Sequence, residues 1–303
     1  MDSELRSQAA RYVQLLRRSG KKDAWLPAGL VRRLPSTASS PVSSPTPRGP
    51  SILPKRSEVG STAAPTALTG TQAPRRHDEK GPQPPAKTLN FQLPAGTKAE
   101  RLAALKKHTS ACTICPHLAK SRTQVVFGVG DPEAKLMFVG EAPGADEDEQ
   151  GEPFVGRAGQ LLTKMIAAME LTRDKVYIAN VLKCRPDMPS KGSGNRKPTR
   201  DEMDACLPYL RTQVSVIAPQ VIVALGSTAV EGLFGPQKTP ISRLRGSWLE
   251  LDGVPVRPTF HPSYLLHNQD MALKRLVWID LLAAMERLGL PISGKQRGFF
   301  LKS

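Results

Sequence analysis

Long apolar runs are missing from this chain of 303 residues. No stretch of about 18 consecutive apolar residues occurs, so the sequence predicts no membrane-spanning helix. The beginning, MDSELRSQAARYVQLLRRSG, also lacks the compact apolar stretch and the small-residue cleavage site of a secretory signal. We therefore expect neither a membrane protein nor an exported one, and we place the protein in the cytoplasm.

Aromatic residues are scarce as well, at 5% of the chain, whereas 28 Pro and 24 Gly are present. Such a composition means that part of the chain cannot bury enough apolar surface to fold. Acidic residues are outnumbered, with 27 Asp and Glu against 43 Lys and Arg, which gives a net charge of +16. The folded part is therefore shorter than the chain, and the protein is strongly basic.

The division of the chain follows from where these residues lie. Residues 1–95 hold 13 of the 28 Pro, no Cys, and 15 Lys and Arg against 6 Asp and Glu. Pro and Ser interrupt helices there, and few apolar residues offset the ordering entropy, so we predict a disordered basic extension. Spacings of three and four between apolar residues predict one short helix at 3–18, either a marginal helix on a tail or a contact for DNA or a protein partner. Residues 96–303 are predicted to fold as one domain.

That domain has the pattern of an α/β protein. Short apolar runs bounded by polar residues or Gly predict buried strands, and longer segments with helical spacing predict helices between them. The strands are expected at 135–140, 176–181 and 221–226, and the helices at 158–169, 199–217 and 274–288. We predict a three-layer sandwich in which helices flank a central, mostly parallel sheet. Ligands collect at the carboxyl ends of parallel strands, so the loops after Gly140, Asn180 and Gly226 are candidate sites.

The folded part contains all four cysteines, spaced C-x2-C-x68-C-x21-C: Cys112, Cys115, Cys184 and Cys206. Four thiolates satisfy either tetrahedral zinc or an iron-sulfur cluster, and the spacing does not distinguish the two. The alternatives are two disulfides, which the missing export signal disfavours, or buried free thiols.

Two histidines, His108 and His117, flank the first cysteine pair. Either could replace a thiolate as a metal ligand. Because the cysteine set is already complete, a solvated or capping role is favoured for both.

A strand runs directly into unusual loop chemistry in KLMFVGEAPGADEDEQGEPFVGRAGQLL, residues 135–162. Its Pro and Gly residues permit sharp turns and a close approach of the backbone to a ligand. Between them lies an acidic loop, which would repel a phosphate backbone unless one or two carboxylates have a chemical role. Most of these carboxylates are interpreted as solvated, and Glu141, at the end of the strand, is the first exception.

A third signal is VRPTFHPSYLL, residues 256–266. An apparent strand ends at Thr259-Phe260, and Pro262 restricts His261 to extended backbone. His261 is then expected to point from the sheet edge into the same region as Glu141. A single His at a strand end is more often structural, so the position alone does not establish a function.

Together these segments resemble one family. The order GEAPG…PFVGRAGQLL, NVLKCRP…NRKPTRDEMDACLPYL, ALGSTAV, LRG and TFHPSYLL resembles the family 4 uracil-DNA glycosylases, the iron-sulfur branch of their superfamily. The match spans about residues 97–285. The resemblance implies a monofunctional glycosylase that flips uracil out of single- or double-stranded DNA, hydrolyses the N-glycosidic bond and leaves an abasic site. It also implies a structural 4Fe-4S cluster, rather than zinc, on the four cysteines.

The resemblance implies roles for the strand-end residues. Asn180 has the amide donor and acceptor needed for uracil O4 and N3-H, and Phe154 is the natural stacking partner of the ring. His261 is placed to donate to uracil O2, and backbone N–H groups around Glu141-Ala142 supply further donors. We expect these groups to meet in one cavity.

Water activation is a separate question. Superfamily members with Asp or Asn two residues after the first Gly of the motif use it on the water, but Ala142 occupies that position here. Glu141 and Glu147 are the candidates, and Glu141 ranks slightly higher. Because the transition state is dissociative, loss of a carboxylate is expected to leave appreciable activity.

Phosphate contacts are expected from polar residues at the motif ends: Lys183, Arg185, Arg196, Arg245 and Ser263. Two departures from the family pattern affect the DNA contacts: Glu152 stands where a basic residue is frequent, and residues 187–194 lengthen a loop. The basic extension adds salt-dependent affinity for DNA. We expect a monomer, with the extension available to a protein partner.

Two other functions remain open from the sequence. One is a weakly catalytic superfamily member that binds uracil-containing DNA or assists a polymerase. The other is a zinc-dependent nucleic-acid module, which would be colourless, whereas an iron-sulfur cluster absorbs broadly in the visible range.

Overall fold

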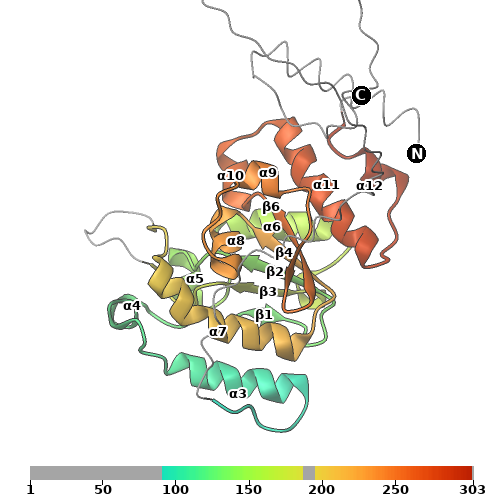
Figure 1. Ribbon diagram of the computed structural model, residues 1–303. Helices are drawn as coiled ribbons and strands as arrows, with labels where there is room; N and C mark the ends of the chain where they lie inside the picture. Colours follow the sequence, from blue (N-terminus) through green and yellow to red (C-terminus); the bar gives the residue numbers. More distant parts are fainter. Residues whose placement is uncertain (1–90, 187–194, 302–303) are drawn as a thin grey trace, which may run out of the picture. The chain divides into compact units, whose positions relative to one another are not determined.

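The computed structural model (Figure 1) describes residues 91–186 and 195–301. The predicted extension, apart from its last five residues, and the predicted helix at 3–18 lie outside the described residues, as does the lengthened loop at 187–194. Within the described part, no helix is long and apolar enough to cross a membrane.

The core of the fold is a six-stranded sheet with the order β1-β3-β2-β4-β6-β5. Its four inner strands run parallel, and each edge strand pairs antiparallel with its neighbour. The strands are β1 (Val129–Gly130), β2 (Leu136–Gly140), β3 (Tyr177–Asn180), β4 (Val221–Leu225), β5 (Leu249–Leu251) and β6 (Val254–Thr259). The three strands expected from apolar runs are β2, β3 and β4, so the predicted mostly parallel sheet is confirmed.

Helices cover both faces of the sheet. Since alternate residues of a strand point to opposite sides, β2, β3 and β4 each contribute to an apolar cluster on each face. Met137 and Val139 of β2 join one apolar cluster, whereas Leu136 and Phe138 join the other. The first cluster includes residues of α3 (Lys98–Ser110), α4 (Pro116–Ser121), α7 (Arg200–Ile217) and α8 (Ser227–Phe234). The second includes residues of α6 (Arg157–Ala168), α10 (Pro262–His267) and α11 (Met271–Arg287). The three-layer α/β architecture is therefore as predicted (Figure 1).

Helix boundaries follow local chemistry. α7 begins after Thr199, whose hydroxyl accepts from the Glu202 N–H while the Glu202 carboxylate accepts from the Thr199 N–H, a reciprocal cap. The acidic segment expected to be a loop is instead the short helix α5 (Ala145–Gln150). Its acidic residues gather in the first turn, where the helix dipole favours them. The remaining helices are η1 (Arg173–Lys175), α9 (Ile241–Leu244) and α12 (Gly294–Gly298).

The folded part begins earlier than the predicted boundary at residue 96. The Phe91 ring stacks on His108 of α3, with centroids 4.2 Å apart, and Leu93 packs against the first apolar cluster. The two apolar residues were too few to predict this from composition. Residues 91–95 therefore belong with the folded domain.

Truncation tests this boundary. A chain that starts at Phe91 should melt at the temperature of the full chain, whereas one that starts at Gly96 should melt several degrees lower, because it lacks the Phe91 stacking and the Leu93 packing. A loss of 1 kcal/mol lowers the melting temperature of a domain of this size by about 2–4 °C. Equal melting of the two truncated chains would show that residues 91–95 contribute nothing.

Candidate functional site

The ends of β2 and β3 bring two side chains together over a glycine. Gly140 and Asn180 are direct partners in the parallel pair. A Cβ on Gly140 would lie 2.4 Å from Asn180 Oδ1 and 2.4 Å from Phe154 Cζ, so any larger residue would displace both groups. Asn180 is 2% exposed, and its Oδ1 has no hydrogen-bond partner among the described residues. A buried, unpaired amide oxygen is an acceptor available to a ligand.

Phe154 is held in an uncommon backbone conformation. Its φ is +56°, in the left-handed region, where a bulky residue is strained. The Arg173 guanidinium fixes this turn by donating to the carbonyls of Phe154 (3.1 Å) and Pro153 (2.8 Å). The Phe154 ring centroid lies 5.7 Å from that of His261. Phe154 therefore connects the β2–β3 end of the sheet with the end of β6.

His261 follows β6 and caps α10. Its Nδ1 accepts from the Ser263 N–H at 3.1 Å, so the neutral ring carries its proton on Nε2. Burial lowers the pKa of His261 to about 4, which keeps the ring neutral at pH 7. A Cβ on Gly226, at the end of β4, would lie 2.9 Å from His261 Cβ, so a glycine is needed for this approach. The site thus has a neutral imidazole with a donor on Nε2.

Glu141 follows directly after β2. Its carbonyl accepts from the Leu182 N–H at 3.0 Å, which extends the β2–β3 pairing past the strand end. Its carboxyl group bonds Thr228, in the first turn of α8. Burial raises the pKa of Glu141, and the Thr228 hydrogen bond and the charge of Lys197 partly oppose that rise. The residue therefore reaches toward the end of β4.

Glu147 has a different setting. Its Oε2 accepts from the Gly144 N–H at 2.9 Å, and its Oε1 accepts from the N–H groups of Val155 and Gly156, both at 3.0 Å. Both carboxylate oxygens therefore tie the turn after Glu141 to the segment that follows Phe154. Ala142, half-buried in that turn, packs against the first apolar cluster.

Three of the basic residues expected at phosphates form internal contacts. Lys183 is 1% exposed, and its ammonium donates to the Asn180 carbonyl at 2.9 Å, so the predicted DNA contact is wrong. The Arg245 side chain is 11% exposed and pairs with the fully buried Asp280 at 2.9 Å, so its charge already has a partner inside the protein. Arg196 donates to both oxygens of Glu202. The sequence reveals the charge of such residues but not their burial.

The other two candidates lie elsewhere. The Arg185 Nε donates to Asn195 Oδ1 at 2.9 Å, and Asn195 in turn donates to the Pro143 carbonyl at 3.2 Å. Ser263, as described above, holds the His261 ring. Ser263 is thus at the strand-end site, and Arg185 lies beside the turn after Glu141.

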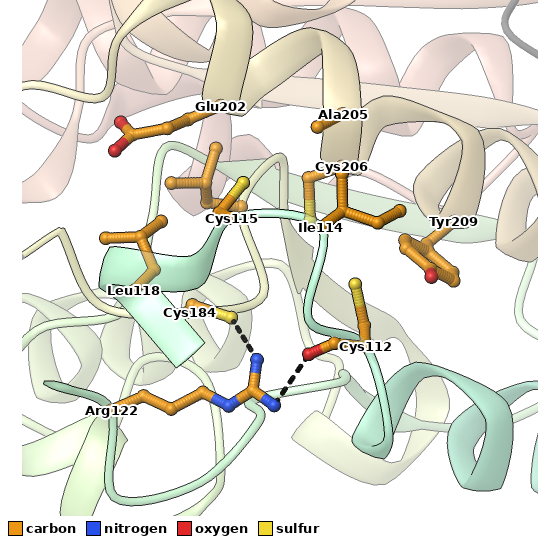
Figure 2. Close-up of a pocket in the computed structure, with 11 residues that line it drawn as sticks. Cys112, Ile114, Cys115, Leu118, Arg122, Cys184, Glu202, Ala205, Cys206 and Tyr209 are labelled. Carbon is orange, nitrogen blue, oxygen red and sulfur yellow. Dashed lines mark hydrogen bonds between the residues drawn. The ribbon is translucent and has the colours of Figure 1, made fainter. Parts of the chain in front are cut away.

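A second site is formed by the four cysteines, which line one pocket (Figure 2). Cys112 follows α3, Cys115 caps α4, Cys184 follows β3, and Cys206 lies in α7. Their sulfur atoms surround the same space, and all four are free thiols. The four cysteines that the sequence groups together thus line one pocket, and none of them forms a disulfide.

The surroundings of the thiols bear on what they hold. Burial raises the pKa values of Cys115, Cys184 and Cys206, the last to about 12, so thiolates there need a compensating positive charge. The Arg122 guanidinium donates to Cys184 Sγ at 3.1 Å, and the Lys183 N–H donates to Cys206 Sγ at 3.3 Å. No group of three or more His, Cys, Asp or Glu within the described ranges is arranged for a single metal ion.

The two histidines considered as substitute ligands have other partners. His108 stacks on Phe91, and His117 Nε2 lies 2.6 Å from Glu202 Oε1. Glu202 also binds Arg196 and the Thr199 N–H; burial alone would raise its pKa, but these hydrogen bonds hold the pKa at about 2. The pocket thus has a cysteine donor set, with ion-paired residues around it.

Comparison with known proteins agrees with this geometry. The family model described as "Uracil DNA glycosylase superfamily" matches residues 127–282, from just before β1 into α11. The "Type-4 uracil-DNA glycosylase" of Thermotoga maritima is 44% identical over 186 residues, which cover 61% of this chain and 93% of that protein. The enzyme of the same description from Archaeoglobus fulgidus is 43% identical over 179 residues, covering 57% and 86%. A "Type-5 uracil-DNA glycosylase" of Thermus thermophilus is 28% identical over 214 residues, covering 59% and 94%.

The chain belongs to the uracil-DNA glycosylase superfamily. Within that superfamily, its relatives place it in the type-4 branch, which confirms the resemblance seen in the motifs.

The role of Glu147 in the loop can be tested by Glu147→Gln. Gln has only one acceptor oxygen, so one or two of the three backbone N–H groups lose their partner, and an unpaired buried N–H costs about 1–3 kcal/mol. Hydrogen exchange at Val155 and Gly156 should become faster, and the melting temperature should fall. Glu149→Gln, on an exposed position of the same helix, is the control; equal effects of the two substitutions would contradict this role.

Proposed function

We propose that the protein is a monofunctional uracil-DNA glycosylase that accepts a flipped-out deoxyuridine, hydrolyses its N-glycosidic bond, and leaves free uracil and an abasic site. The observation that supports this most directly is the unpaired, buried amide oxygen of Asn180, which lies with Phe154 at Gly140; the Phe154 ring in turn lies 5.7 Å from that of His261. A base in a duplex is stacked and paired, so it must leave the helix to reach a site built in this way.

Base selection is assigned to Asn180. Its Oδ1 would accept from uracil N3-H and its amide N–H would donate to O4. Cytosine has an acceptor at N3 and a donor at the 4-position, so it would leave both groups of a buried amide unpaired. A site built to hydrogen-bond its substrate discriminates strongly for this reason. Phe154, locked beside Gly140, would stack on the ring.

Stabilisation of the departing uracil is assigned to His261. Because its Nδ1 accepts from Ser263, the ring presents an Nε2–H donor to uracil O2. Negative charge develops on that oxygen as the bond to the sugar breaks, and a fixed donor costs no reorganisation at that moment. Backbone N–H groups around Glu141-Ala142 add further donors.

Orientation of the attacking water is assigned to Glu141 rather than Glu147. Both oxygens of Glu147 already accept from the backbone, which supports a role in shaping the loop. Glu141 has a pKa raised by burial, and a carboxylate whose pKa lies nearer to the working pH is a better base. The carboxylate would orient the water and balance charge on the sugar.

The monofunctional assignment has its own support. Strand nicking by glycosylases requires an amine that attacks the sugar. Of the two lysines in the motifs, Lys183 directs its ammonium at the Asn180 carbonyl and Gln213, and Lys197 pairs with Glu231. The weakly catalytic binder is not favoured, since the relatives that match most of their own length are described as type-4 uracil-DNA glycosylases.

We also propose that Cys112, Cys115, Cys184 and Cys206 hold a 4Fe-4S cluster. The cysteine-only donor set and the cavity that the four thiols share support this, because iron-sulfur clusters are held by thiolates. When bound, the cluster would order the segments that carry its ligands and take no part in hydrolysis. Arg122, donating to Cys184 Sγ, would stabilise that thiolate.

The substrate class is uracil-containing DNA, single- or double-stranded, and we propose a cytoplasmic monomer. Residues 1–95, mostly outside the described residues, are proposed as a basic extension that adds affinity for DNA and offers a site to a protein partner. Arg185 and Ser263 remain candidates for phosphate contacts.

Release of uracil from an oligonucleotide tests the proposed activity. Asn180→Ala and His261→Ala should each lower kcat/KM at least 100-fold, because each removes a hydrogen bond made to the base in the transition state. Glu141→Gln should lower it less, about 10-fold. Binding of uracil-containing DNA without release of the base by the unaltered protein would support the non-catalytic alternative.

Burial of neutral His261 makes stability depend on pH. The unfolded chain binds a proton at the ordinary pKa of 6.5, whereas the folded protein does so only near 4, so the contribution is present above 6.5 and is lost as pH falls toward 4. Lowering the pH from 7 to 5 should therefore reduce the free energy of unfolding by about 2 kcal/mol through His261. His261→Asn should show a correspondingly smaller decrease in a pH series of denaturant melts; an unchanged dependence would mean that His261 titrates normally.

The metal proposal predicts a coloured protein. The purified chain should absorb broadly in the visible range and contain four iron atoms per molecule. Cys206→Ser should lose most of that iron and melt at lower temperature, because a hydroxyl is a poor substitute for a thiolate. A colourless protein with one equivalent of zinc would exclude the cluster.

A further inference from the structure

Lys183 is a charged side chain inside the protein. It is 1% exposed, among the largest fully buried side chains of the described residues. Its ammonium donates to the Asn180 carbonyl at 2.9 Å and to Gln213 Oε1 at 2.5 Å, and it lies 5.9 Å from the centre of the Phe127 ring. A buried ammonium costs several kcal/mol unless it is paired, so a Leu or Met would serve better if the position only filled space.

The first of these partners is the backbone of the residue that reads the base. Asn180 cannot be held by its own Oδ1, which has no partner. The residue is held by its main chain, through the pairing with Gly140 on one side and the bond from Lys183 to its carbonyl on the other. The position of the Asn180 carbonyl sets the Cα and hence the direction of the side-chain amide.

The same lysine also belongs to the thiol site. Its backbone N–H donates to Cys206 Sγ at 3.3 Å, and the next residue in the chain is Cys184. Its carbonyl accepts from the Val126 N–H at 2.8 Å. Lys183 therefore contacts the cysteine site through its main chain and Asn180 through its side chain.

We propose that Lys183 is a positioning residue: it transmits the fixed geometry of the cysteine site to Asn180 and thereby sets the aim of the amide that recognises uracil. This rests on the proposed function of Asn180. It gives the cysteine site a place in substrate selection without any part in the chemistry, since Cys206 holds the backbone of Lys183, whose side chain reaches back to the end of β3.

The decisive variant is Lys183→Met, which keeps most of the volume and removes the ammonium. Gln213→Leu is the matched control. It removes the buried hydrogen bond from Lys183 to Gln213 and the two that Gln213 donates to the Phe127 carbonyl and the Tyr177 hydroxyl, but it leaves the bond from Lys183 to Asn180. The iron content and visible absorption of the full-length holoprotein should be unchanged in both, because all four cysteines remain.

At temperatures well below melting, Lys183→Met should lower kcat/KM for uracil release at least 10-fold and weaken the binding of free uracil, measured by calorimetry, by a similar factor. Gln213→Leu should change both by less than 3-fold even though it lowers the melting temperature. In an Asn180→Ala background, Lys183→Met should cause no further loss beyond about 2-fold, because no amide remains to be positioned.

An equal, multiplicative loss in the Asn180→Ala background, or wild-type uracil affinity in Lys183→Met, would overturn the inference and leave Lys183 a structural residue. If Lys183→Met does not fold, the same comparison is made with Lys183→Leu, which also cannot donate to the Asn180 carbonyl; unchanged uracil affinity and an additive double variant there would likewise overturn it. Failure of the unaltered protein to release uracil would refute the proposed function itself, and the two failures are thus distinct.

Discussion

The site depends on the parallel pairing of β2 with β3, which places Gly140 opposite Asn180. Because Gly140 has no side chain, the Asn180 amide and the Phe154 ring can occupy the space that a Cβ would fill. A shift of the pairing by one residue would turn Asn180 to the other face of the sheet. The chemistry of the site therefore rests on backbone hydrogen bonds formed between apolar strands, before any polar side chain is considered.

A glycine plays the same part at the pair of β4 with β6. Gly226, at the end of β4, allows His261 to approach closely, and Gly226 N–H donates to the Thr259 carbonyl at 2.8 Å. Gly140 and Gly226, at the carboxyl ends of parallel strands, thus leave room for the side chains of Asn180, Phe154 and His261. Ligands bind at this edge of open α/β sheets for the general reason that the loops from several strands converge there.

Most polar side chains near these two glycines have hydrogen-bond partners. Glu147 accepts from the backbone there, Arg173 donates to it, and Ser263 donates to the His261 ring. Lys183 contacts both Asn180 and Cys206 of the cysteine pocket. Such bonds determine positions to within a fraction of an ångström, and catalytic groups need that precision because their hydrogen bonds weaken steeply with misalignment.

The sequence by itself determined the sheet, because apolar runs report burial, and it grouped the four cysteines, because a C-x2-C pair can place two thiolates on one metal centre. Its motifs also predicted that Asn180, Phe154 and His261 share a site, and the structure places Asn180 with Phe154 and Phe154 with His261. It did not show the partners of the basic residues: Lys183 and Arg245 were expected at phosphates, but they pair with the Asn180 carbonyl and with Asp280. Nor did it show that the acidic segment forms α5, or that both carboxylate oxygens of Glu147 accept from the backbone. Only the tertiary structure decided these points, because the partner of a charged side chain comes from a distant part of the chain, and local sequence carries the charge but not the partner.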